Sequence, residues 1–138
     1  MGLDQYAFFI KKEDKEKLKI NEDNVTVSLK KEEDTLFDHD DFYWRKHPDL
    51  EYFMVKEYQS RIEEQGGYID DFNCLFLPLN KETIATLRQQ TKEMTLEKGE
   101  GFFWGESTPD DYKQTLEFCD LADKCLDEGG LPIYYSWW

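Results

Sequence analysis

Four short stretches of the chain have the hydrophobic pattern of β-strands. Apolar and polar positions alternate at residues 24–31, whereas residues 72–79 are almost continuously apolar, as in a strand covered on both faces. Pro78 is expected to end that strand because proline cannot donate to a neighbouring strand. The charged run at residues 11–23 predicts an exposed turn or loop. The predicted strands are residues 5–10, 24–31, 72–79 and 131–138.

A longer segment, residues 38–67, repeats its apolar positions at helical spacing. Asp40 or Asp41 can cap the start of this helix, and the Gly66-Gly67 pair supplies its end. Pro48 leaves two alternatives open: it kinks one long helix, or it begins the main helix at its first turn. The expected buried face consists of Tyr43, His47, Leu50, Met54, Tyr58 and Ile62.

Two further helices are predicted at residues 80–94 and 108–130. Asn80 is expected to cap the first and Thr108 the second, with Asp111 completing a capping box. The expected buried faces are Ile84, Leu87, Thr91 and Met94 in the first helix, and Tyr112, Leu116, Cys119, Ala122 and Leu126, widened by Phe118, Leu121 and Cys125, in the second. The order of elements predicts a single α+β domain over residues 1–138, with about four mostly antiparallel strands and three helices on one face.

The chain is strongly acidic, with 31 Asp and Glu against 17 Lys and Arg in 138 residues, a net charge of −14. This charge disfavours direct contact with nucleic acid or anionic membranes, which require basic side chains. No apolar run is long enough to span a membrane and no basic leader precedes the first strand, so a cytoplasmic location is expected. There, Cys74, Cys119 and Cys125 would be reduced and mostly buried. A partner protein with a basic surface is the natural counterpart of this charge.

The segment GEGFFWGESTPDDY, residues 99–112, has the glycines of a phosphate-binding loop. However, no basic residue precedes Lys113, and Glu100, Glu106, Asp110 and Asp111 would repel an anion. Thr108, Pro109 and Asp111 instead fit the start of a helix. The segment therefore predicts a tight corner that caps a helix and packs Phe102, Phe103 and Trp104.

Asp38, His39, Asp40 and Asp41 are weak candidates for a metal site because they combine carboxylate and imidazole ligands. Consecutive side chains diverge, so an acidic helix start is the preferred interpretation. We therefore predict no metal, cofactor or catalytic residue. The alternative is a small metal-assisted hydrolase that uses the carboxylates of residues 38–41 and 106–111.

Aromatic side chains provide the candidates for binding. In a strand at residues 131–138, Tyr135 and Trp137 point away from Tyr134, Ser136 and Trp138, and an exposed set would anchor an interface. The candidate binding residues are Tyr43, Trp44, Arg45, Trp104, Tyr135 and Trp137.

Four short motifs, MGLDQY at residues 1–6, YWRK at 43–46, GFFWGES at 101–107 and the ending YYSWW, occur in this order. Together they resemble an uncharacterised family of small proteins from tailed phages and prophages. The chain departs from that pattern with Gln5 in place of a usual Met, with an inserted Glu106, and with Pro48 where the first helix normally continues.

The resemblance implies an accessory phage protein in the host bacterial cytoplasm, with YWRK on the first helix. Together with the charge, it predicts a non-enzymatic protein that binds a host protein through an acidic, aromatic-anchored surface, including inhibition or mimicry of nucleic acid.

Overall fold

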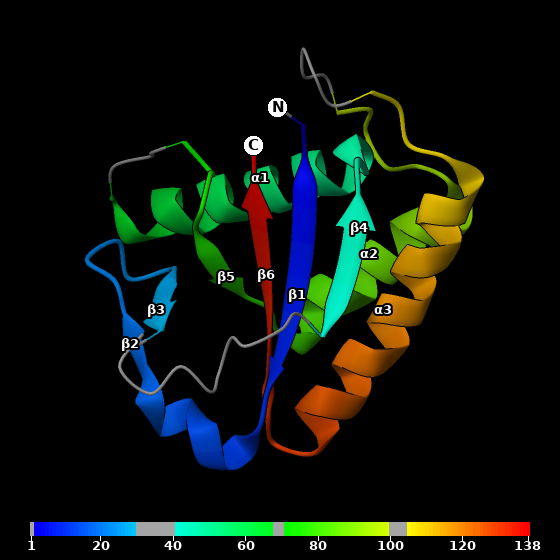
Figure 1. The fold of residues 1–138 in the computed structure, drawn as a ribbon. Helices are drawn as coiled ribbons and strands as arrows, with labels where there is room; N and C mark the ends of the chain where they lie inside the picture. The colour runs from blue at the N-terminus through cyan, green and yellow to red at the C-terminus, as the bar shows by residue number, and fades with distance from the viewer. Residues whose placement is uncertain (1, 30–40, 68–70, 100–104) are drawn as a thin grey trace.

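The computed structural model describes residues 2–29, 41–67, 71–99 and 105–138 (Figure 1). In these residues, six strands form one sheet in the order β2-β3-β5-β6-β1-β4, with every neighbouring pair antiparallel. The strands are β1 (Asp4–Ile10), β2 (Leu18–Ile20), β3 (Val27–Leu29), β4 (Phe42–Arg45), β5 (Phe76–Pro78) and β6 (Leu131–Trp137). The helices are a 3-10 helix η1 (Lys12–Lys17) and the α-helices α1 (Pro48–Gln65), α2 (Lys81–Glu93) and α3 (Pro109–Asp127).

The α+β class and the antiparallel sheet are confirmed, but the described residues contain six strands instead of about four, and a 3-10 helix in addition to three α-helices. The two additional strands are short: β2 has three residues within the charged run, and β4 has four residues within the predicted first helix. Strands this short carry too few side chains to show a clear alternating pattern.

All three α-helices pack on one face of the sheet, as expected (Figure 1). Ala7 of β1 and Tyr134 of β6 are paired across the sheet, and both are fully buried against these helices. The helices contribute the largest part of this core: Leu50, Met54, Tyr58 and Ile62 from α1, Ile84 and Leu87 from α2, and Phe118, Cys119 and Ala122 from α3. The second face of the sheet carries a smaller cluster built on Phe8, Ile10, Val27 and Ile133.

The predicted helix at residues 38–67 is wrong in its first part. Residues Phe42–Arg45 form strand β4, which pairs with β1, so Tyr43 does not lie on a helix and the YWRK motif is not on the first helix. The helix begins at Pro48, which decides between the two alternatives. Proline restricts the residue before it to extended conformations, so the helix could not include His47. The end of the helix is as expected, with Gly66 in the left-handed conformation.

Asp41 does not cap α1, contrary to expectation. Its carboxylate accepts a hydrogen bond from the Phe9 N–H (2.7 Å), and its own N–H donates to the Ala7 carbonyl (3.0 Å), which extends the pairing of β4 with β1. The N–H of Asp49, in the first turn of α1, instead donates to Ser107 Oγ (3.1 Å). The cap is supplied by a residue far along the chain, which no local pattern can show.

The predicted strands also differ in extent. The charged run at residues 11–23 is not a loop alone, because it contains η1 and the edge strand β2. The strand predicted at residues 24–31 is Val27–Leu29 in the described residues, and the one at 72–79 is Phe76–Pro78, ending at the expected proline. Thr26, a polar position in the alternating stretch at residues 24–31, is fully buried, and its hydroxyl donates to Asp23 and accepts from Asn21.

The predicted caps of α2 and α3 are confirmed. Asn80 accepts from the Thr83 N–H, and Thr108 and Asp111 form the complete capping box. Two predicted core residues are wrong: Met94 is 70% exposed at the end of α2, and Leu121 is 43% exposed on α3. In α3 the buried face is rotated toward Asp111, Thr115, Phe118, Cys119, Ala122 and Cys125. Cys119 and Cys125 are therefore buried, whereas Cys74 is exposed.

Candidate functional site

Three strands that are neighbours in the sheet place exposed aromatic and charged side chains side by side on the second face. Asp4 of β1 pairs with Arg45 of β4 on one side and with Trp137 of β6 on the other, and residues paired in this way share a face. The adjacent row consists of Tyr43, Tyr6 and Tyr135 in the same three strands. We call this surface, formed by Asp4, Tyr6, Tyr43, Arg45, Tyr135 and Trp137, the aromatic sheet end.

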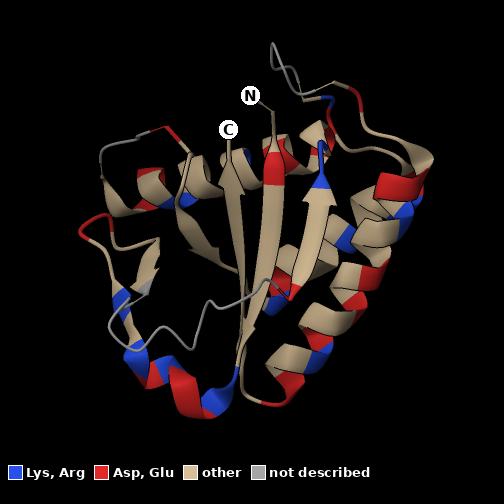
Figure 2. Cartoon of the chain, in the orientation of Figure 1, with Lys and Arg blue, Asp and Glu red and all other residues tan. Residues whose placement is uncertain are grey.

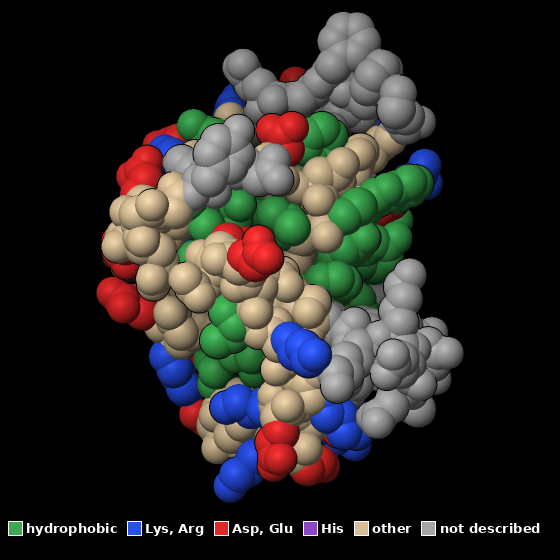
Figure 3. All heavy atoms as spheres, turned by 90° about the vertical axis from the view of Figure 1, so that its left-hand side faces the viewer, with side chains coloured by type: hydrophobic (Ala, Val, Ile, Leu, Met, Phe, Trp, Pro, Cys, Tyr) green, Lys and Arg blue, Asp and Glu red, His purple; other side chains and the backbone are tan. Residues whose placement is uncertain are grey.

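The rings of the second row form a continuous series across four strands. Tyr43 and Tyr6 are 5.2 Å apart between ring centroids, Tyr6 and Tyr135 are 6.0 Å apart, and Tyr135 stacks on Phe76 of β5 at 4.5 Å. In Figure 3, hydrophobic side chains gather at the right-hand side, toward which this second face looks. Ring contacts of this kind hold each side chain in a fixed position, so the surface is organised before any partner arrives.

Tyr43 and Trp137 are the most accessible aromatic side chains of this surface, at 39% and 55% exposure. The Tyr43 hydroxyl donates to the Asp4 carboxylate (2.7 Å). This hydrogen bond, more than the partial burial of the ring, raises the pKa of Tyr43 to about 12, so the side chain stays a neutral phenol. The surface therefore combines two large apolar anchors with one acidic and one basic group.

Of the six predicted binding residues, the structure brings together Tyr43, Arg45, Tyr135 and Trp137. Trp44 points to the opposite face of β4, where it is fully buried; its indole N–H donates to Thr115 Oγ1 of α3 (3.2 Å) and its ring packs against Phe118. Trp104 lies outside the described residues.

A buried polar network lies directly behind the aromatic sheet end. Glu51 of α1 is fully buried, and it accepts hydrogen bonds from the Tyr134 hydroxyl (2.7 Å) and the Ser136 hydroxyl (3.0 Å) of β6. Burial raises the pKa of Glu51 to about 7, against the smaller opposing effect of these hydrogen bonds. The alternation along β6 therefore puts Trp137 on the outside and the two partners of Glu51 inside.

Gln5 of β1 ties this network to the start of α1. Its amide nitrogen donates to the Tyr134 hydroxyl (2.7 Å) and to the His47 carbonyl (2.9 Å), and its amide oxygen accepts from the His47 N–H (2.7 Å). A methionine at this position could not make these three bonds. Gln5 thus has a structural role that the sequence pattern did not reveal.

His47 was expected to be an interior histidine, and it is fully buried. Its Nδ1 lies 2.7 Å from Ser107 Oγ, while its Nε2 has no hydrogen-bond partner among the described residues. Burial lowers the pKa of His47 to about 4, against the opposing effects of the Asp111 and Asp49 carboxylates. Ser107 therefore links His47 to the first turn of α1.

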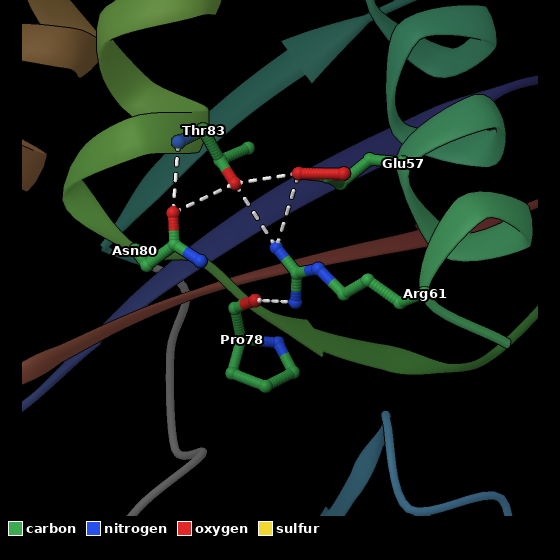
Figure 4. A network of polar contacts seen from close by, with 5 residues as sticks. All are labelled: Glu57, Arg61, Pro78, Asn80 and Thr83. Atoms are coloured by element: carbon green, nitrogen blue, oxygen red, sulfur yellow. Dashed lines mark hydrogen bonds and ion pairs between the residues drawn. The ribbon is translucent and has the colours of Figure 1, made fainter. Parts of the chain in front are cut away.

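A groove of about 740 Å³ lies between α1 and α2 on another part of the molecule. Figure 4 shows Glu57 and Arg61 projecting from α1 toward Pro78 and the start of α2. Arg61 donates to the Pro78 carbonyl (2.6 Å), to Thr83 Oγ1 (3.1 Å) and to Glu57 (3.5 Å). The other basic group of the lining, Lys56, pairs with Glu97 (2.7 Å). Both basic side chains of the lining are thus already paired within the protein. The groove therefore favours neutral or cationic ligand groups over anionic ones.

We interpret the Arg61 contacts as hydrogen bonds that hold α1 against β5 and α2. Arg61→Met is expected to lower the free energy of unfolding by about 1 to 3 kcal/mol, because the Glu57 carboxylate and the Pro78 carbonyl lose a charged donor. Lys56→Met is the matched control, since it removes an exposed pair and should cost about 0.5 kcal/mol or less. Urea denaturation followed by circular dichroism measures both. Equal losses in the two variants would contradict the structural role of Arg61.

The candidate metal and hydrolase residues do not come together where the structure describes them. Asp41 borders Cys125 and Glu128 near the end of α3, whereas Asp111 is in its first turn, about 25 Å away along the helix axis. Asp111 is used in the capping box, and Glu106 and Asp110 are exposed. Asp38, His39 and Asp40 lie outside the described residues. Within the described ranges, no three His, Cys, Asp or Glu side chains are grouped so that they could hold a metal ion.

Sequence reasoning missed Glu51, although a signal was present. Glu51 falls at helical spacing with His47, Met54 and Tyr58, so it lies on the apolar face of α1. An acidic residue on such a face indicates a buried, hydrogen-bonded carboxyl group. Its partners on β6 could not be found this way, because they lie more than eighty residues further along the chain.

No helix in the described part of the chain is both long enough and apolar enough to cross a membrane. Comparison of the chain with protein-family models, with curated proteins and with solved structures found no match.

Proposed function

We propose that this protein acts by binding a partner protein with a basic surface, and that the aromatic sheet end is the surface of contact. The observation that supports this most directly is the exposure of Trp137 and Tyr43, at 55% and 39%, on the two strands that flank β1 in the sheet. Large aromatic side chains on a rigid element lose little conformational entropy on binding and are enriched at the centres of interfaces. The resemblance to phage proteins favours a bacterial host protein in the cytoplasm as the partner.

The charge of the molecule supports the choice of partner. Helix α3 alone carries six acidic against two basic residues, and Figure 2 shows acidic positions along the ribbon of this helix. The aromatic sheet end itself has one of each sign, Asp4 and Arg45. The acidity therefore acts over a distance, where it accelerates the approach of a positively charged protein, while the aromatic groups determine how long the complex lasts.

Trp137→Ala is expected to weaken binding of the partner at least about tenfold, because a half-exposed indole at the centre of an interface is worth about 1.4 kcal/mol or more. The partner is first captured from bacterial lysate on the immobilised protein, purified, and its affinity measured. Raising the salt concentration from about 0.05 M to about 0.5 M should slow association, because it screens the charges.

Met94→Ala is the matched control, since it removes an exposed apolar side chain of α2 and should leave the affinity unchanged. A partner that binds the Trp137→Ala and wild-type proteins equally well would refute the assignment of the surface. Association that does not depend on salt would refute the role of the acidic exterior.

A further inference from the structure

The end of strand β6 connects the aromatic sheet end to a single buried carboxyl group. Trp137 faces outward, and the residue before it, Ser136, donates its hydroxyl to Glu51 Oε2. Tyr134, two residues further back, donates to Glu51 Oε1. Two side chains near the end of β6 are therefore hydrogen-bonded to the same carboxyl group, that of Glu51.

Among the residues that the structure describes, no charge near Glu51 would balance a carboxylate. From β6 it is faced by Tyr134, Ser136 and Trp138, all uncharged. From β1, Gln5 reaches the network through the Tyr134 hydroxyl. Glu51 makes no ion pair with any of the residues that the structure describes, and burial is the largest influence on its pKa, which it raises to about 7.

The two titratable groups nearest to Glu51 on its N-terminal side in the sequence, Asp49 and His47, contact other partners. Asp49 accepts from the Gly99 N–H (3.1 Å) and from the Tyr112 hydroxyl (2.7 Å), on the side of α3. His47 contacts Ser107, and burial keeps it neutral by lowering its pKa to about 4. The pKa of Tyr134 is raised well above its usual value, so its hydroxyl keeps its proton. Glu51 is therefore the one group in this network that changes charge near neutral pH.

We propose that Glu51 is a pH-dependent switch for the end of β6: with its proton in place, the strand end is closed and presents Trp137, and when the proton is lost, the strand end opens so that water reaches the carboxylate. An isolated buried charge is costly, and it is relieved most easily where the chain can open locally. The last residue, Trp138, is held by Asn73 and by the Phe72 carbonyl, in a partly exposed region at the strand end. β6 is paired with β5 and β1, and opening at its end disturbs these pairings less than opening the middle of the strand.

This inference rests on the proposed function in its last step only, namely that the closed strand end is the form that binds the partner. The opening itself is a property of the protein alone. It is tested by NMR on the isolated chain, with the Glu51 carboxyl carbon followed through a pH titration and amide-exchange protection factors measured for residues 134–138.

We expect the protection factors of these amides to fall at least about tenfold between about pH 6 and about pH 8, with the same midpoint as the Glu51 carboxyl carbon. In Glu51→Gln the protection should not depend on pH. Glu57→Gln, which changes a partly exposed glutamate of the same helix, is the matched control and should behave like the wild type.

Unchanged protection, or a change with a midpoint different from that of Glu51, would overturn the proposal. The comparison of midpoints uses the wild-type protein, so it decides the matter even if Glu51→Gln does not fold. A decrease that persists in folded Glu51→Gln would also overturn it.

The partner protein separates this inference from the proposed function. If the strand end opens as expected and binding weakens over the same pH range, both are supported. If it opens but binding depends neither on pH nor on Trp137, the switch is correct and the binding surface is wrong. If binding depends on Trp137 and the strand end does not open, the surface is supported and the switch is refuted.

Discussion

Replacing Trp44 by alanine is expected to lower the free energy of unfolding by about 3 to 5 kcal/mol, the largest effect of any single change considered. Trp44 is fully buried between the sheet and α3, with its ring centroid 4.6 Å from Phe42 and 4.9 Å from Phe118. Alanine leaves a cavity at this contact, because rings held by several neighbours cannot close over the missing indole. It also removes the donor for Thr115 Oγ1. Urea denaturation measures the loss.

Two other variants show whether the burial of Trp44 causes the expected loss of stability. Trp44→Phe keeps an aromatic ring at the same place and should recover a large part of the lost stability. Trp137→Ala removes the same type of side chain from the exposed face of β6 and should cost about 1 kcal/mol or less. A Trp44→Ala protein as stable as Trp137→Ala would contradict the central position of Trp44 in the core.

Glu51→Gln is expected to change the pH dependence of stability strongly. Glu51 keeps its proton in the folded protein up to a pKa of about 7, compared with 4.5 for an ordinary glutamate. Its contribution to folding is therefore complete below pH 4.5 and is lost as the pH rises through about 7. Each pH unit between these values corresponds to about 1.4 kcal/mol, so the loss reaches at most about 3 kcal/mol.

The glutamine variant has no such loss, because its side chain stays neutral at every pH. Relative to the wild type, Glu51→Gln should gain up to about 3 kcal/mol between about pH 4.5 and about pH 8. Denaturation curves of both proteins at these two pH values give this difference directly. A difference that does not vary with pH would show that Glu51 is ionised throughout this range.

His47 has the opposite effect on how the free energy of unfolding of the wild type depends on pH. Its pKa is lowered from 6.5 to about 4 in the folded protein, so its contribution is complete above pH 6.5 and is lost as the pH falls through about 4. Between pH 4.5 and pH 6.5 the two slopes oppose each other. In that interval these two groups should therefore cause little net change in the free energy of unfolding of the wild type. Replacing either group should uncover the pH dependence that the other one causes.

The parts of the fold that the sequence predicted correctly depend on short-range signals. Asn80, Thr108 and Asp111 satisfy backbone groups within their own first turns, and Gly66 ends α1 by its own conformation. Such interactions leave a trace within four residues and can be recognised without knowledge of the fold.

The errors arise where distant segments determine local structure. Residues Phe42–Arg45 have a pattern compatible with either helix or strand, and pairing with β1 makes them a strand. Arg45, Tyr135 and Trp137 could be chosen as candidate residues from their chemistry alone. That they share one surface with Asp4 follows only from the order of strands in the sheet.

The same order of strands affects how the protein is made. Seven residue pairs join β1 to β6, from Asp4 with Trp137 to Ile10 with Leu131, and these two strands occupy the interior of the sheet. The contacts that complete the core thus connect segments more than a hundred residues apart, which is the arrangement that slows folding. During synthesis, β1 can pair with β4 early, but its pairing with β6 has to wait until the ribosome has released the chain through Trp137. Until then the aromatic residues of β1 remain available to chaperones.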